Sequence, residues 1–173
     1  MSPLSLLQVI DSADGIDTRK RMQKLVFMLK AAGCELGADY VIHRYGPYSQ
    51  DVARACDTLV QRGLLLEERE ETGWGQQYSY CLTDEGREYL ATTKAPHDLS
   101  PWREEIDDWI GQAMWPLEVA STVAFHLVKG DDIEDACTKA FDFKDVEVGS
   151  PVADAAREIA EKAVSFRLPA KRG

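Results

Sequence analysis

Two segments decide the expected fold: residues 19–29, Arg19-Lys20-Arg21-Met22-Gln23-Lys24-Leu25-Val26-Phe27-Met28-Leu29, and residues 45–49, Tyr45-Gly46-Pro47-Tyr48-Ser49. In the first segment, Met22, Leu25, Val26 and Leu29 recur at helical spacing, and the basic residues fall largely off that stripe. This spacing predicts an amphipathic helix that is capped by Asp17 or Thr18 and closed by Gly33.

The second segment predicts a turn into another helix. Pro47 fixes its own φ angle and biases Gly46 away from the α region, so that Ser49 is positioned as a helix cap. The helix is expected to run to Arg62, because Gly63 follows. Outward from these two helices, the pattern predicts a helix over residues 3–13 and a short strand over 40–45.

Two strands are expected at residues 64–72 and 76–82, separated by Gly73-Trp74-Gly75, which suits a tight hairpin. Thr83 then caps a further helix. Helices followed by a two-stranded hairpin are the order of a winged helix-turn-helix, so we predict a winged-helix domain with a β-hairpin wing over residues 1–95.

Residues 96–173 are expected to form an acidic, all-helical bundle, which makes the whole chain α+β. Helices are predicted from Ser100-Pro101, over 116–129 and 132–141, and from Ser150-Pro151. The aromatic side chains of this half are expected in its core or at its seam with the first domain: Trp102, Trp109, Trp115, Phe125, Phe141 and Phe143. An alanine-lined face on the last helix could support intramolecular packing or a homodimer.

The chain has 173 residues, is 45% hydrophobic and carries a formal net charge of −10. Residues 1–95 hold 11 Lys and Arg against 14 Asp and Glu, and residues 96–173 hold 9 against 16. Such a chain repels phosphate at long range, so any DNA contact needs a local basic patch. Without a membrane-length apolar run or a secretory signal, a cytoplasmic location and no membrane partner are expected.

Candidate DNA-binding side chains come from both helices. Arg19, Lys20, Arg21 and Lys24 form a dense basic cluster, although they could instead neutralise nearby aspartates. The helix from Ser49 would present five polar or basic side chains to base edges and phosphates: Gln50, Arg54, Thr58, Gln61 and Arg62. Because Asp51 and Asp57 share this face, a structural helix with a solvated face remains the alternative.

The predicted wing is acidic: four glutamates, Glu67, Glu68, Glu70 and Glu71, surround Arg69. A wing that contacts DNA normally presents cations. Trp74 and Gln76 at its tip are candidate contacts for a protein partner. The alternative is that Trp74 folds back onto its own sheet.

The segments quoted above, with Leu59-Val60-Gln61-Arg62-Gly63-Leu64, resemble the YwgA-like family of small prokaryotic proteins and, more distantly, the Panacea (SocA-like) antitoxin domain. The resemblance covers roughly residues 18–66 and implies a winged-helix fold and a role near regulators or antitoxins. This chain has Met22 where the family tends to have leucine. Within the motif, Gln23, Tyr45 and Tyr48 could pack structurally, with the tyrosine hydroxyls bonded to Gln23 or to backbone, or could line a ligand-sensing pocket.

Catalytic signatures are lacking. His43, His97 and His126 are scattered without metal-binding spacing, and no phosphate-binding glycine loop or nucleophile elbow occurs. The four cysteines have no CxxC spacing, so no metal or cofactor is expected. We therefore expect a non-enzymatic regulatory or antitoxin-like module that binds DNA weakly or conditionally. The alternatives are a protein-interaction adaptor that does not bind nucleic acid and, third, a small-molecule sensor or enzyme.

Overall fold

The computed structural model describes residues 1–73 and 75–166, and it confirms the α+β class. The chain order is α1 (Pro3–Ser12), β1 (Ile16–Asp17), α2 (Arg19–Ala31), β2 (Val41–His43), β3 (Gly46–Tyr48), α3 (Gln50–Gln61), β4 (Leu65–Thr72), β5 (Gly75–Leu82), α4 (Asp84–Thr92), a 3-10 turn (Ser100–Trp102), α5 (Arg103–Gly111), α6 (Met114–Val128), α7 (Ile133–Lys144) and α8 (Pro151–Ser165).

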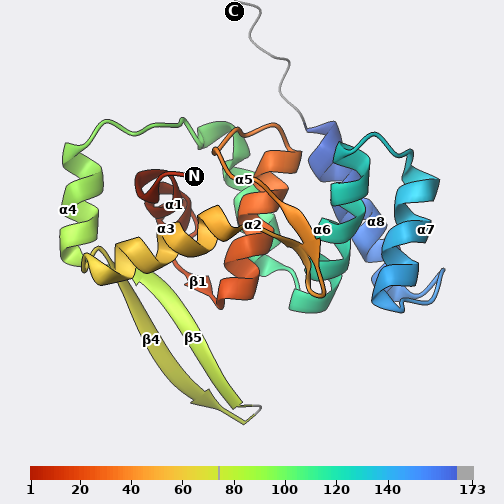
Figure 1. The fold of residues 1–173 in the computed structure, drawn as a ribbon, viewed down its shortest axis with the longest axis horizontal. Helices are drawn as coiled ribbons and strands as arrows, with labels where there is room; N and C mark the ends of the chain where they lie inside the picture. Colours follow the sequence, from red (N-terminus) through yellow and green to blue (C-terminus); the bar gives the residue numbers. More distant parts are fainter. Residues whose placement is uncertain (74, 167–173) are drawn as a thin grey trace, which may run out of the picture.

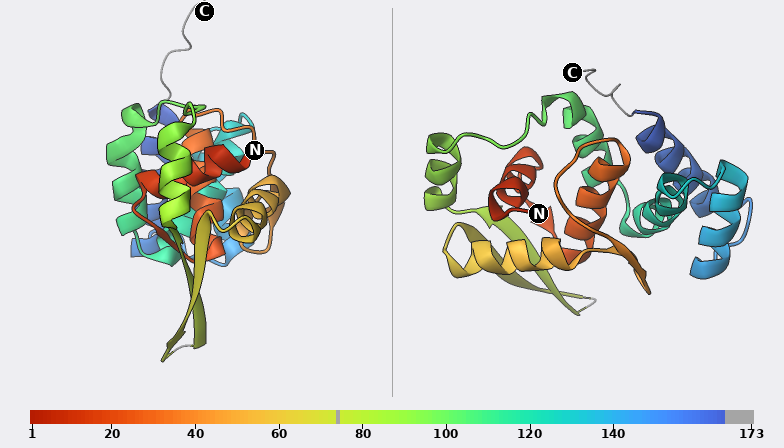
Figure 2. Two further views of the ribbon diagram at one scale, coloured as in Figure 1. Left: turned by 90° about the vertical axis from the view of Figure 1, so that its left-hand side faces the viewer. Right: turned by 45° about the horizontal axis from the view of Figure 1, so that its top comes forward.

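A three-stranded antiparallel sheet has the strand order β1-β5-β4. Ile16 pairs with Tyr80, and the β4–β5 ladder runs from Leu65 opposite Leu82 to Thr72 opposite Gly75. The base of the β4–β5 hairpin lies against the helices, and the rest extends away from the body of the molecule (Figure 1; Figure 2, left). Most side chains of its outer half are therefore exposed.

A second hairpin corrects the expectation for residues 40–49. Gly46-Pro47-Tyr48 is not a break between a strand and a helix, because these residues form β3 and pair antiparallel with β2. Gly46 adopts a backbone φ of +88°, a conformation that residues other than glycine rarely adopt. Proline has no backbone N–H to donate. Both strands of a two-stranded ladder are edge strands, so proline is tolerated at position 47.

Helix α2 lies at the centre of the molecule, between α1 and α3 on one side and α6 on the other (Figure 1; Figure 2, right). It is therefore buried nearly all round and not on a single stripe. The sequence placed Lys24 on a polar face, whereas the structure leaves its side chain 2% exposed. The reason is that helix α6 and the β2–β3 hairpin cover that face.

The second half of the chain packs onto α2 through α5 and α6. Helix α6 begins at Met114, two residues before the expected start. Four of the six aromatic side chains predicted for the core of residues 96–173 are buried. Trp115 is 43% exposed and Phe143 is 49% exposed, against expectation. The buried alanines of α8 belong to the helix packed most extensively on α6, so this face serves packing within the chain.

Candidate functional site

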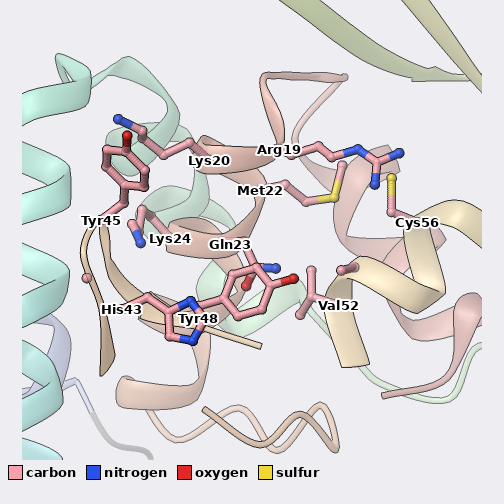
Figure 3. A pocket seen from close by; sticks show the side chains of 12 residues that line it. Arg19, Lys20, Met22, Gln23, Lys24, His43, Tyr45, Tyr48, Val52 and Cys56 are labelled. Atoms are coloured by element: carbon pink, nitrogen blue, oxygen red, sulfur yellow. The ribbon is translucent and has the colours of Figure 1, made fainter. Parts of the chain in front are cut away.

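A cavity of about 410 Å³ lies between α2, the β2–β3 hairpin and α3 (Figure 3). Its size falls in the range of small-molecule sites. All three elements contribute to the wall, α2 with five residues, the hairpin with four and α3 with three. The lining residues are Arg19, Lys20, Met22, Gln23 and Lys24 from α2, His43, Tyr45, Gly46 and Tyr48 from the hairpin, and Val52, Ala53 and Cys56 from α3.

One side of the cavity is apolar, because α3 presents Val52, Ala53 and Cys56 there and α2 adds Met22. The hairpin side is aromatic. The rings of His43 and Tyr48 are stacked with centroids 4.7 Å apart and an interplanar angle of 9°. This wall suits the flat apolar part of a small ligand.

Gln23 fixes the join between the hairpin and α3. Its side-chain amide donates to the backbone oxygen of Ser49 at 2.9 Å and accepts from the Ser49 N–H at 2.9 Å. The Ser49 hydroxyl in turn caps α3 by accepting from Val52 N–H. Tyr48, which one sequence alternative expected to bond Gln23 or backbone, instead donates its hydroxyl to Gln50 Oε1 at 3.3 Å. The tyrosine hydroxyl that does bond Gln23 is that of Tyr40, at 3.4 Å from the Gln23 backbone oxygen.

Lys24 lines the same cavity, and its amine points toward the hairpin near Tyr45 (Figure 3). Its Nζ donates to the Pro47 carbonyl at 2.9 Å. Burial lowers the pKa of Lys24 to about 7, against a partial opposing effect of Glu118, while the positive charges of Lys144 and Lys20 lower it further. The side chain is thus a buried amine close to its own midpoint of titration at neutral pH.

Behind Lys24 lies an ionic cluster, buried at Glu118 and Lys144, that ties α6 and α7 to the hairpin. Glu118 Oε1 lies 2.6 Å from Lys144 Nζ, and Glu118 Oε2 lies 3.0 Å from Lys20 Nζ. Lys144 also donates to the backbone oxygen of Arg44 in the hairpin turn at 2.8 Å. Lys20 Nζ stands 4.5 Å from the centroid of the Tyr45 ring, a cation–π contact.

No protein-family model matches the sequence. YwgA of Bacillus subtilis, itself described as an uncharacterized protein, is 30% identical over 130 residues, which cover 75% of this chain and 75% of the relative. The chain belongs to the YwgA-like family. Because membership brings no known activity, the chemistry of this YwgA-like protein has to be argued from its own side chains.

The four basic residues predicted as one patch have separate partners in this YwgA-like protein. Arg19 pairs with Asp57 at 2.6 Å and with Glu67 at 3.0 Å at the base of the β4–β5 hairpin. Arg21 donates to the backbone oxygens of Ile110 and Gln112 at the end of α5, at 3.1 and 2.8 Å. Lys20 forms an ion pair with Glu118, and Lys24 is buried. Within the described residues, α2 therefore presents no continuous cationic surface.

Tyr80 completes the network at the base of the β4–β5 hairpin. Its hydroxyl donates to Glu67 Oε2 at 2.7 Å and accepts from Arg19 Nε at 2.9 Å. The hydrogen bond from Tyr80, followed by that from Arg19, lowers the pKa of Glu67. This network joins the sheet to α2 and α3.

Helix α3 keeps four of its five predicted contact residues on the surface: Gln50, Arg54, Gln61 and Arg62 are exposed. The fifth, Thr58, is partly buried and its hydroxyl donates to the Arg54 backbone oxygen at 2.8 Å. Across residues 1–73 and 75–166, neither Arg54 nor Arg62 has an ion-pair partner. The structure therefore leaves two cations available on α3.

The β4–β5 hairpin exposes Glu68, Arg69, Glu70 and Glu71 on β4. Gln76 is exposed on β5, near the tip, as a partner contact would require. Trp74 lies outside the described residues. The surface of this hairpin is acidic, as the sequence indicated.

Sequence reasoning missed Glu118 and Lys144 beneath the hairpin, and His43, Met22, Val52 and Cys56 in the cavity wall. One signal was present for Glu118: it is a lone charge inside the apolar run from Met114 to Phe125. In the part of the chain that the structure describes, no group of three or more His, Cys, Asp or Glu side chains could hold a metal ion. None of the described helices is both long and apolar enough to cross a membrane.

Proposed function

We propose that this chain is a non-enzymatic regulatory module with a winged-helix core, and that its input is a small molecule bound between α2, the β2–β3 hairpin and α3. The single observation that carries the proposal is the cavity of about 410 Å³, which combines an apolar wall with a buried amine. Apolar pockets with a few convergent polar groups are the usual form of ligand sites.

The element order supports the winged-helix part of the proposal. Helix α1, strand β1, helices α2 and α3, and the β4–β5 hairpin follow one another, and β1 pairs with β5 at the sheet edge opposite β4. In this scheme α3 is the helix that would contact a duplex and the β4–β5 hairpin is the wing. The β2–β3 hairpin is an insertion between α2 and α3.

The position of the cavity supports a regulatory role. Val52, Ala53 and Cys56 line it from the inner side of α3, whereas Gln50, Arg54 and Gln61 lie on the exposed side of the same helix. A ligand that binds one position of α3 better than another shifts that helix toward the favoured position. Ligand binding and contact through α3 would then be coupled.

A fragment screen tests the proposal. Ala53 is partly buried on the cavity wall, so Ala53→Phe should fill the space, whereas Gln61→Phe places the same ring on the exposed side of α3. We expect fragments that raise the melting temperature of the wild type and of Gln61→Phe to have no effect on Ala53→Phe. A screen in which no fragment distinguishes the two variants would reject the cavity as a ligand site.

For the output we retain DNA contact through α3, in the weak or conditional form that the charge balance implies. Arg54 and Arg62 supply exposed cations, and Arg19 offsets Asp57 on the neighbouring surface. Affinity for duplex DNA should fall steeply between low and moderate salt, and Arg54→Ala should cost about 1–3 kcal/mol if Arg54 pairs with a base. Absence of duplex binding at low salt, with and without a cavity ligand, would eliminate DNA as the output.

A second candidate, a protein-interaction adaptor, is favoured by the acidic hairpin that extends from the body (Figure 1). A basic protein surface is a better electrostatic match for Glu68, Glu70 and Glu71 than a phosphate backbone is. In a pull-down, Glu68→Lys with Glu70→Lys should lose partners that the wild type retains, without a lower melting temperature. An unchanged set of partners would contradict the adaptor.

A further inference from the structure

We infer that the ligand of the cavity is a small aromatic or otherwise apolar carboxylate, whose negative charge binds Lys24 Nζ while its apolar part lies against Met22 and Val52. This inference rests on the proposed ligand-binding function and adds the chemical class of the ligand. It follows from hydrogen-bond capacity, local charge and the shape of the wall.

Three cationic side chains line the cavity, and two of them are already engaged. The guanidinium of Arg19 binds Asp57 and Glu67, so it is directed away toward the β4–β5 hairpin. The ammonium of Lys20 binds Glu118 and lies over the Tyr45 ring. A negatively charged ligand therefore has Lys24 as its available partner.

Lys24 is incompletely satisfied. A lysine ammonium has three donor hydrogens, but within the described residues Lys24 Nζ makes a single hydrogen bond, to Pro47 O. Its side chain is 2% exposed, so bulk water does not readily supply the remaining acceptors. Unsatisfied donors on a buried charge are costly, and a carboxylate oxygen is a strong acceptor for them.

The local charge also favours an anion. Lys20, Lys24 and Lys144 surround one buried carboxylate, Glu118, whose two oxygens are used by Lys20 and Lys144. When Lys24 is protonated, its charge thus has no partner of its own. A single carboxylate neutralises it, whereas a phosphate would need donors beyond this one amine.

On the hairpin side, the backbone of Gly46 packs closely beside the amine and α6, which leaves the cavity side of the amine for a ligand. Gly46 has no Cβ, and a Cβ built there would lie 2.8 Å from Thr122 Oγ1 and 3.4 Å from Lys24 Nζ. The stacked His43 and Tyr48 rings and the apolar wall of α3 then accept carbon atoms. One charged end and one flat apolar body are the features of an aromatic carboxylate.

Binding of such a ligand should depend on pH. The carboxylate needs the ammonium form of Lys24, whose pKa burial has lowered to about 7 in the free protein. Above that pH the ligand must bind together with a proton, so the dissociation constant should rise by nearly tenfold per pH unit. The other groups that face Lys24 are Lys20, Glu118 and Lys144, and His43 lines the same cavity.

The test uses pairs of neutral and charged probes on the full chain. A panel of aromatic carboxylates, such as phenylacetate and naphthalene-2-carboxylate, is titrated alongside the matching carboxamides at pH 6.5, 7.5 and 8.5. We expect each bound carboxylate to exceed its carboxamide at least tenfold in affinity at pH 6.5, and to lose most of that advantage at pH 8.5. Carboxamide affinity should stay constant.

Variants assign the effect to Lys24. Lys24→Met should remove the preference for carboxylates, while Lys94→Met, a change of an exposed lysine in the segment after α4, should keep it. If Lys24→Met does not fold, the pH profile of the wild type still decides. Because His43 lines the same cavity, His43→Gln must retain the profile.

The outcomes separate the two proposals. Equal affinities for carboxylates and carboxamides, or a carboxylate preference that persists in Lys24→Met, would overturn the inference but leave the cavity as a ligand site. If only neutral or cationic fragments bind, the carboxylate inference is likewise overturned and the cavity remains a ligand site. If no fragment distinguishes Ala53→Phe from Gln61→Phe, the proposed function and this inference fall together.

Discussion

Gln23 and Ser49 are joined by two hydrogen bonds of 2.9 Å, in which the side-chain amide of Gln23 pairs with both backbone groups of Ser49. Ser49 follows the last residue of β3 that pairs with β2, and the Gln23 amide supplies hydrogen-bond partners for its backbone. All of these groups are buried. A residue of α2 thereby sets the place where α3 begins.

Replacing Gln23 with leucine should lower the free energy of unfolding by about 2–3 kcal/mol, because the buried N–H of Ser49 loses its partner and the Ser49 C=O keeps only the bond from Ala53 N–H. Urea denaturation measures the change. Gln61→Leu, at an exposed position of α3, serves as the control and should stay within about 0.5 kcal/mol of the wild type. If both variants lose the same free energy of unfolding, the hydrogen bonds between Gln23 and Ser49 do not stabilise the fold.

Arg21 caps α5 from a distant part of the chain, through the backbone oxygens of Ile110 and Gln112. Arg21→Ala should cost about 1–2 kcal/mol, since hydrogen bonds from a charged donor to partly buried carbonyls are lost. Arg103→Ala removes an exposed i,i+4 pair on α5 with Asp107 and should cost at most about 0.5 kcal/mol. Thermal unfolding that ranks the two variants in the reverse order would contradict the capping role.

Two glycines at helical positions should respond oppositely to alanine. A Cβ on Gly86, near the start of α4, would lie 2.1 Å from the Leu64 backbone oxygen, whereas a Cβ on Gly111 would meet nothing within 4 Å. Gly86→Ala should destabilise the fold by about 1–3 kcal/mol through this clash. Gly111→Ala should be neutral or stabilise it by up to about 1 kcal/mol. Chemical denaturation of both variants checks the contrast.

The titration of Lys24 should make stability rise with pH above neutrality. Its pKa is about 7 in the folded chain, against an ordinary value of 10.5. Between these values the unfolded chain holds a proton that the folded chain does not, so the free energy of unfolding increases by up to about 1.4 kcal/mol per pH unit. Below pH 7 both states are protonated and this slope disappears.

Lys24→Met should remove that slope, so the stability of wild type relative to the variant should increase from pH 7 to pH 9. Lys94→Met should run parallel to the wild type, because Lys94 is exposed. Urea midpoints at pH 6, 7, 8 and 9 measure the three curves. Parallel curves for Lys24→Met and the wild type would mean that Lys24 is not titrating in this range.

Local signals in the sequence were enough to predict most helices and the β4–β5 hairpin. Ser49, Thr83 and Ser150 each cap a helix as expected, because a cap involves neighbours within three residues. Pairing of β2 with β3 was not predictable in the same way, since the Gly46-Pro47 signal suits a turn as well as a short strand. The docking of that hairpin on α6 decides between them.

The sequence by itself determined the α+β class, the caps, the family resemblance and three of the residues that line the cavity, Gln23, Tyr45 and Tyr48. The tertiary structure alone decided that Gln23 and Lys24 are buried and that Arg19 and Arg21 have separate partners. The burial of Lys24 and the partners of Arg21 depend on α5 and α6, which lie some 80 to 100 residues further along the chain. Ser49, which pairs with Gln23, and the acidic partners of Arg19 lie 26 to 48 residues further along. Helical periodicity records which residues share a face of α2, but it carries no information on which distant element covers that face.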